Sequence, residues 1–333
     1  MLFLISGCLQ VIAQDTHFSQ FFEAPLLRNP SLAGIYNGDI RVQGIYRDQW
    51  NSVSNAFRTG SLNAEYKMPI GKSDDFITTG VQFLFDKAGT VGLATTQVLL
   101  ALNYHKSLSN EKPMYLSFGF MGGLISKTID ASKMTTDQQF VGAFNPDLAN
   151  GETFAVPDYV TWDANAGMSF NTAVGQDPTN MIFVGIAIHH LNRPRNSFYK
   201  DVNIELHPKY VFSAGLRLRV DDFSSFILQS DQSVQGSFKE TIAGALYSYN
   251  LGVDPENSIY TISAGGFLRW RDAVIPVIRL ERSPIAVGIS YDVNISQLKT
   301  VSQGRGGFEI SVTYAGFFNR NNSSRNKVLC PRF

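Results

Sequence analysis

The histidines and cysteines are the residues in this sequence best suited to metal or nucleophilic chemistry, and their spacing favours neither. The 333-residue chain has five histidines and two cysteines. His189 and His190 are adjacent, so on an extended strand their side chains would point to opposite faces and could not bind one metal together. Removal of Cys8 with an apolar N-terminal stretch would leave Cys330 without a partner for an intrachain disulfide or a thiolate site. We therefore expect no metal and no cofactor.

The short motifs of common enzyme classes are also missing. The sequence contains no G-x-S-x-G, no G-x-x-x-x-G-K-[ST] and no G-x-G-x-x-G. The run FGFMGG around Gly119 falls within an alternating segment, where small residues are expected to relieve crowding rather than to bind phosphate. A hydrolase would need a Ser or Asp aligned with a histidine, and the sequence does not decide whether distant segments bring such a pair together. We expect a protein that is not an enzyme.

The composition excludes two further classes. Lys and Arg total 28 and Asp and Glu total 28, so the net charge is zero and a nucleic-acid-binding protein is disfavoured. Charged residues make up 17% of the chain, whereas 25 Phe, 13 Tyr and 28 Gly are typical of strands with aromatic surfaces and tight turns. A disordered chain is therefore excluded, and one large all-β unit is favoured over two domains.

From Asp39 onward the sequence alternates between apolar and polar residues in short segments bounded by turn formers. Near the end, Phe308, Ile310 and Val312 fall on one face of a strand, while Glu309 and Ser311 fall on the other. About fourteen such segments are expected as strands, near residues 39-50, 58-68, 76-86, 94-105, 114-126, 159-170, 180-190, 207-219, 223-233, 238-250, 258-270, 274-281, 284-291 and 306-318.

The lengths of these segments predict a transmembrane antiparallel β-barrel over residues 39-318. Most have about 10 to 13 residues, close to the number needed to cross a bilayer at a tilt and more than the usual ~5–6 of soluble strands. The three longest gaps, 127-158, 191-206 and 292-305, alternate with short ones, as external loops alternate with periplasmic turns.

A soluble β-sandwich is the alternative fold, and the length of the strands argues against it. In a barrel, lipid covers the apolar face and the lumen receives the charged residues, which are Arg217, Arg219, Arg269, Arg279, Glu281 and Glu309.

The two ends of the chain lie outside this barrel. Residues 1-13 form an apolar segment that is too short for a membrane-spanning helix, and we expect a signal peptide with cleavage after Ala13. No basic residue precedes Arg28, so the start of the signal is expected to be truncated. A lipobox-like run ending at Cys8 offers a competing cleavage with a lipidated cysteine. Residues 319-333 are expected to be a periplasmic C-terminal tail.

Residues 14-38 form a separate N-terminal segment that does not alternate. Phe18, Phe21 and Leu26 could anchor it against the inner wall or the periplasmic mouth of the barrel as a plug. The alternative is a short amphipathic lead-in to the first strand. An even number of strands would leave both ends of the barrel on the periplasmic side, so we expect this segment to lie there with the short turns.

Several stretches resemble the PorP/SprF family of membrane proteins of the type IX secretion system of Bacteroidetes. These stretches are HFSQFFEAPLLRNPSLAG at 17-34, YRDQW at 46-50, HLNRPRNSF at 190-198, HPKYVFSAGLRL at 207-218, GGFLRWRDAVIP at 265-276, VGISYDVNISQL at 287-298 and GGFEISVTY at 306-314. Each motif alone is weak, but their order is specific and covers most of the chain. Segment 127-158 carries no motif that matches.

The resemblance implies a non-enzymatic barrel of the outer membrane that serves protein secretion and gliding motility. The expected partners are outer-membrane lipid, periplasmic secretion components and a secreted surface adhesin with a C-terminal secretion signal, which the barrel would dock or retain. The alternative is an outer-membrane diffusion channel or a transporter of hydrophobic molecules. The resemblance implies partner-binding residues within these motifs, namely His17, Phe18, Gln20, Asn29, Pro30, Arg47, Gln49, Trp50, His190, Arg193, Pro194 and Asp292.

Overall fold

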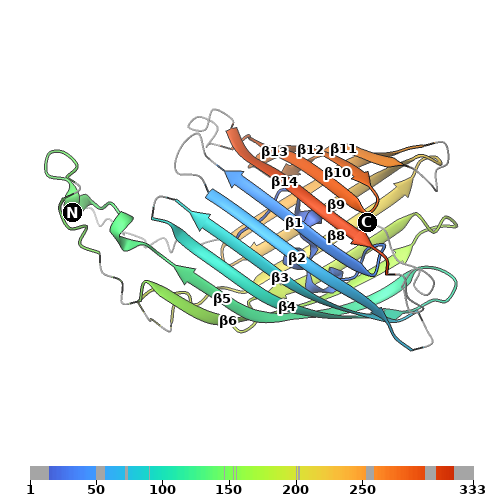
Figure 1. Cartoon of the computed structure of the whole chain (residues 1–333), viewed down its shortest axis with the longest axis horizontal. Helices are drawn as coiled ribbons and strands as arrows, with labels where there is room; N and C mark the ends of the chain where they lie inside the picture. The colour runs from blue at the N-terminus through green and yellow to red at the C-terminus, as the bar shows by residue number, and fades with distance from the viewer. Residues whose placement is uncertain are drawn as a thin grey trace, which may run out of the picture.

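Fourteen antiparallel strands close into a barrel in this computed structural model, with each strand hydrogen-bonded to its neighbours in sequence and β1 to β14 (Figure 1). The structure describes residues 15–49, 57–71, 74–89, 91–145, 147–152, 154, 156–199, 201, 203–252, 259–296 and 305–318. The expected signal peptide, the lipidated Cys8 and the expected tail at 319-333 lie outside the described residues. The strands are β1 (Ile40–Gln49), β2 (Phe57–Pro69), β3 (Phe76–Ala88), β4 (Leu93–Ser107), β5 (Met114–Thr128), β6 (Asp158–Ala173), β7 (Met181–His189), β8 (Lys209–Arg219), β9 (Ser224–Gln235), β10 (Phe238–Leu251), β11 (Tyr260–Arg269), β12 (Ala273–Arg282), β13 (Ile285–Asn294) and β14 (Arg305–Gly316).

The barrel predicted from the alternation is confirmed, and each expected segment corresponds to one strand. Closure is a regular antiparallel ladder in which Ile40 of β1 pairs with Gly316 of β14 and Gln49 pairs with Gly307. The connections after the odd-numbered strands meet at one end, which we call the long-loop end because it includes residues 129–157 and 190–208. The connections after the even-numbered strands meet at the opposite, short-turn end, where β1 also begins and β14 ends.

The outer face of the barrel is apolar and the inner face is polar. Along β14, Phe308 and Val312 expose 41% and 48% of their surface, whereas Glu309 and Ser311 expose 0% and 2%. The period-2 alternation of a strand separates these two sets, because successive side chains leave opposite faces of the sheet. An apolar exterior is stable only against hydrocarbon, so this surface indicates a barrel surrounded by lipid.

The aromatic residues near strand ends divide between the two faces. Trp162 and Trp270 expose 69% and 64% of their surface on the outside, as expected for an interfacial girdle. Tyr159, near the start of β6, is instead buried and packs edge to face on Phe198 with ring centroids 5.1 Å apart. Within the described residues, no helix is long and apolar enough to span a membrane.

Residues 15–38, the lumen segment, lie inside the barrel as short helical turns rather than a strand. The turns are η1 (Phe21–Glu23), α1 (Pro25–Arg28) and η2 (Pro30–Leu32). Pro25 and Pro30 occupy first-turn positions, where a missing N–H costs nothing, and the Asn29 side chain accepts a hydrogen bond from the Ser31 amide at 2.9 Å. Leu26 is fully buried, so the segment packs against the wall of the barrel.

Candidate functional site in the lumen and at the long-loop end

The lumen segment crosses the barrel from one end to the other. At the long-loop end, the Asp15 carboxylate lies 2.7 Å from Nε2 of His190, which follows the end of β7. At the short-turn end, the Tyr36 hydroxyl donates to the Asp39 carbonyl at 3.1 Å, and Lys67 Nζ donates to the Tyr36 carbonyl at 2.6 Å. The segment was expected against the inner wall or at the periplasmic mouth of the barrel. It lies along the inner wall, and only its last residues lie with the short turns.

A buried ionic cluster holds the first part of this segment at the long-loop end. Arg47 and Arg269 each donate to the Asp292 carboxylate, at 3.0 and 3.1 Å. The Glu309 carboxylate, fully buried, lies 3.4 Å from Arg47 and also accepts the backbone amide of Ser19, 2.6 Å away. Arg269 additionally donates to the Ser19 hydroxyl. Charges buried this deeply require partners, so the loss of any one would leave the others uncompensated.

His190 forms a second charged contact between the segment and the barrel. Its ring bridges two carboxylates, with Nδ1 2.8 Å from Asp163 and Nε2 2.7 Å from Asp15. Burial by itself would lower the pKa of His190, but the two carboxylates raise it to about 9. The ring is therefore charged at neutral pH and links Asp15 to β6.

The expectation that His189 and His190 point to opposite faces is wrong. Both side chains reach the lumen, with ring centroids 6.5 Å apart, and His189 Nε2 lies 3.4 Å from the Arg28 carbonyl. The reason is that β7 ends at His189 and His190 adopts a φ of 57°, which turns its side chain back inward. Within the part of the chain that the structure describes, no group of three or more His, Cys, Asp or Glu could hold a metal ion.

The middle of the segment approaches the wall where the strands have no side chain. A Cβ on Gly119 would overlap the Pro30 carbonyl group, and a Cβ on Gly167 would overlap the Asn29 side-chain oxygen. Asn29 Nδ2 also donates to the Ile186 carbonyl of β7 at 3.1 Å. The run FGFMGG at Gly119 therefore relieves crowding, as the sequence predicted, and it makes room for a backbone.

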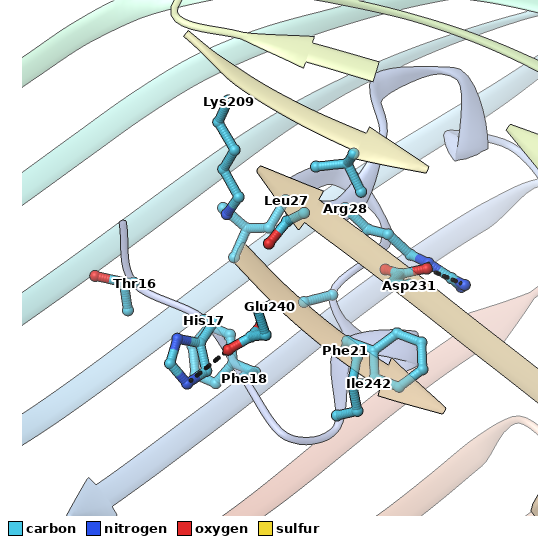
Figure 2. Close-up of a pocket in the computed structure, with 13 residues that line it drawn as sticks. Thr16, His17, Phe18, Phe21, Leu27, Arg28, Lys209, Asp231, Glu240 and Ile242 are labelled. Atoms are coloured by element: carbon cyan, nitrogen blue, oxygen red, sulfur yellow. Dashed lines mark hydrogen bonds and ion pairs between the residues drawn. The ribbon is translucent and has the colours of Figure 1, made fainter. Parts of the chain in front are cut away.

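Residues that the structure describes line two cavities beside the segment. A large cavity of about 900 Å³ occupies the short-turn end and is lined by charged residues that include Arg41, Arg217, Arg279 and Glu281. A small cavity of about 60 Å³ lies nearer the long-loop end (Figure 2). Figure 2 shows the His17 ring next to the Glu240 carboxylate among the residues that line this small cavity. His17 Nε2 lies 3.6 Å from the Glu240 carboxylate.

The β5–β6 loop, residues 129–157, projects beyond the other described parts of the long-loop end (green in Figure 1). Its base is fixed to the β7–β8 loop by a hydrogen bond from the Val156 amide to the Phe198 carbonyl at 2.9 Å and by the rings of Phe154 and Phe198, 6.0 Å apart. Side chains support its outer part, since Asn150 donates to the Ala131 carbonyl at 2.7 Å. The loop thus has a defined shape without belonging to the sheet.

The structure brings most of the residues expected for partner binding together. Those in the lumen or at its long-loop rim are His17, Phe18, Gln20, Asn29, Pro30, Arg47, His190 and Asp292. Arg193 and Pro194 lie in the β7–β8 loop, where Pro194 accepts the Leu206 amide at 2.8 Å. Gln49 ends β1 opposite Gly307, and Trp50 lies outside the described residues. The buried members contact this same chain, so in this structure they support the lumen segment.

Sequence reasoning missed Asp15 and Asp163 as residues of this site. They lie 148 positions apart (163 − 15) and meet only through His190. Asp163 is an inward-facing charge on an alternating strand, which was a usable signal. No feature of the sequence signals Asp15.

A closed barrel with an apolar exterior and a charged, internally bonded lumen defines an outer-membrane protein. The family model for the type IX secretion system membrane protein PorP/SprF matches residues 11–314. The chain belongs to this family, as its motifs predicted, and is a secretion-related barrel of the outer membrane.

Two of the solved structures that match this chain are toluene transporters. The toluene transporter TbuX of Ralstonia pickettii is 9% identical, with a TM-score of 0.48 over 87% of this chain and 91% of that one. The toluene transporter TodX of P. putida is 11% identical, with a TM-score of 0.46 over 90% and 95%. These similarities are too low to transfer a substrate to this chain. A search of curated proteins finds no match.

Proposed function

We propose that this barrel docks or retains a secreted surface adhesin at its long-loop end, through the C-terminal signal domain of the adhesin. The short-turn end would face periplasmic components of the secretion machinery. No chemical step is needed for this role, so the protein would act as a binding and positioning component and not as an enzyme.

The path of the lumen segment carries this proposal. The segment is hydrogen-bonded to strands on all sides of the lumen, including β2 through Glu65, β9 through Asp231 and β14 through Glu309. A lumen occupied in this way favours a role for the surfaces at its two ends over a role in transport. The β5–β6 and β7–β8 loops, joined at their bases, supply the larger of these surfaces.

Co-purification from native membranes tests the proposal. A tagged wild-type barrel is expected to recover an adhesin together with secretion components. A matched variant that replaces residues 134–149 by a short Gly-Ser linker should lose the adhesin and retain the periplasmic partners. Recovery of neither class by the wild-type barrel would contradict the proposed function.

The orientation of the barrel can be tested in whole cells. In a Cys330→Ser background, a cysteine at Ala143 of the β5–β6 loop is expected to react with a membrane-impermeant maleimide. A cysteine at Leu108, in the β4–β5 turn at the opposite end, should react only after the outer membrane is permeabilised. The reverse labelling pattern would place the long loops in the periplasm and would overturn docking at the cell surface.

A diffusion channel or a transporter of hydrophobic molecules is the second candidate, and the cavity of about 900 Å³ at the short-turn end favours it. In this case the lumen segment would be a removable plug. Deletion of residues 14–36 should then raise conductance in planar bilayers, and substrate should open the wild-type barrel. If the wild-type barrel shows no conductance with any solute tested, docking is favoured.

A further inference from the structure

A turn of the β5–β6 loop, at residues 140–144, exposes large apolar side chains at the long-loop end. Phe140, Val141 and Phe144, which we call the aromatic tip, expose 63%, 74% and 50% of their surface. Unlike the exposed apolar residues of the strands, they lie on a loop that projects past the barrel (Figure 1). An apolar group kept exposed at such a position is typical of a binding surface.

The turn that carries the aromatic tip is preorganised. Phe140 and Phe144 form an isolated antiparallel bridge, which places their side chains on the same face of the turn. The Val141 amide donates to the Ala143 carbonyl at 3.0 Å, and Gly142 supplies the positive φ of 74° that the reversal requires. A fixed turn loses little conformational freedom on binding, so its two rings are suited to act as anchors.

The charge of the surrounding loop indicates what kind of surface would cover the tip. Residues 129–157 contain four acidic residues and one basic residue. The basic residue, Lys133, is paired with Asp130 at 2.6 Å. Asp137 and Asp147 are exposed beside the aromatic tip, and neither forms an ion pair with another described residue. The tip therefore lies on an acidic loop, between two exposed aspartates in the sequence.

This charge distinguishes between three possible occupants. An anionic lipid surface would be repelled, because membrane association of this kind uses basic and not acidic residues. A second copy of the chain would bring two acidic loops together, which is unfavourable for the same reason. A protein with an apolar pocket and a basic rim is complementary to the tip in both respects.

We infer that the aromatic tip is the anchor by which the barrel holds its protein partner, inserting Phe140 and Phe144 into an apolar pocket rimmed by Lys or Arg. This inference rests on the proposed function, since it names the docking surface for the secreted domain. The inference requires that the secreted domain carry, on one face, an apolar pocket surrounded by basic residues. Asp137 and Asp147 would speed association by attraction at the rim.

Binding of purified components tests the inference. The mature barrel in detergent would be titrated with isolated C-terminal signal domains of type IX cargo proteins from the same organism. Phe140→Ala/Phe144→Ala is expected to weaken the Kd about 100-fold or more, since each anchor accounts for about tenfold. Asp137→Asn/Asp147→Asn should slow association several-fold, and added salt should reduce this difference. Leu108→Ala is the matched control, because Leu108 is 49% exposed at the opposite end, and should leave the Kd unchanged.

Three results would overturn the inference, and they are distinguishable. If the wild-type barrel binds a domain and Phe140→Ala/Phe144→Ala changes the Kd by less than twofold, the aromatic tip is not the anchor, but the proposed function stands. If no domain binds the wild-type barrel, both the anchor and the proposed function are contradicted. A third test uses an environment-sensitive fluorophore on Ala143→Cys in a Cys330→Ser background. Its emission should shift to the blue on addition of the binding domain, whereas a shift with phosphatidylglycerol vesicles alone would assign the tip to lipid.

Discussion

The lumen segment and the β5–β6 loop have similar local structure, but the lumen segment is buried in the barrel and the loop is exposed to solvent. Each contains short helical turns rather than strands, and each begins a turn with an Asx side chain that accepts a serine amide, at Asn29 and at Asp130. The lumen segment buries charged residues such as Glu23 and Arg28 against the barrel, whereas the loop exposes Phe140 to solvent. Similar local structure therefore has two outcomes. Inside the barrel it holds the lumen segment against the strands, and at the long-loop end it leaves apolar side chains exposed to solvent.

The largest effect is expected from the ionic cluster that fixes the lumen segment. Glu309→Ala removes the acceptor of the Ser19 amide and leaves the buried Arg47 short of a counter-charge, which should cost about 3–5 kcal/mol of unfolding free energy. Urea unfolding in detergent measures this loss, and hydrogen exchange should show faster exchange at residues 16–24. Arg58→Ala is the control, because its pair with Asp48 is exposed and should contribute less than about 1 kcal/mol. Equal effects of the two changes would refute the importance of the cluster.

The next effect is a pH dependence at the outer end of the segment. The folded pKa of His190 is raised to about 9 from 6.5, so its stabilising contribution is fully present below about pH 6.5 and is lost as the pH rises through 9. The loss should reach at most about 3 kcal/mol. Urea midpoints of the wild type should fall between pH 7 and pH 10, and those of His190→Gln should fall less. The exposed His207→Gln should follow the wild type, and a flat wild-type profile would contradict the assigned contact.

A smaller effect is expected where the segment touches glycine. Gly119→Ala places a methyl group against the Pro30 carbonyl and should cost about 1–3 kcal/mol, because backbone on both sides resists movement. Gly60→Ala, on β2 with no atom within 4 Å of the new methyl group, should change stability by less than about 0.5 kcal/mol. Urea unfolding distinguishes the two. A neutral Gly119→Ala would mean that the segment can leave this position at little cost.

The smallest effect on stability is expected at the aromatic tip. Phe140→Ala and Phe144→Ala should each change the unfolding free energy by less than about 0.5 kcal/mol, because the rings are exposed. Phe198→Ala, at the base of the same loop, should cost about 1 kcal/mol through its contacts with Tyr159 and Phe154. Thermal unfolding followed by gel mobility checks both changes. A destabilising tip substitution would show that these rings support the fold and are not kept for binding.

The sequence was sufficient to predict the barrel, but it predicted only some of the residues that meet in the lumen. The alternation of Phe308 and Val312 with Glu309 and Ser311 assigned the faces of β14 correctly, because it depends only on neighbours along the chain. The motifs placed Arg47 and Asp292 among the expected partner-binding residues, but gave no indication that the two side chains form an ion pair with each other. His190 was misassigned to a face, because the end of β7 and a single positive φ decide its direction.

By itself, the sequence determined a fourteen-stranded barrel with lipid outside and charge inside, since period-2 patterning and strand length are local properties. Only the tertiary structure decided the path of residues 15–38 through the lumen. The hydrogen bond from the Ser19 amide to Glu309 spans 290 positions and exists only when β14 closes the barrel against β1. Such contacts follow from closure, so no local pattern encodes them.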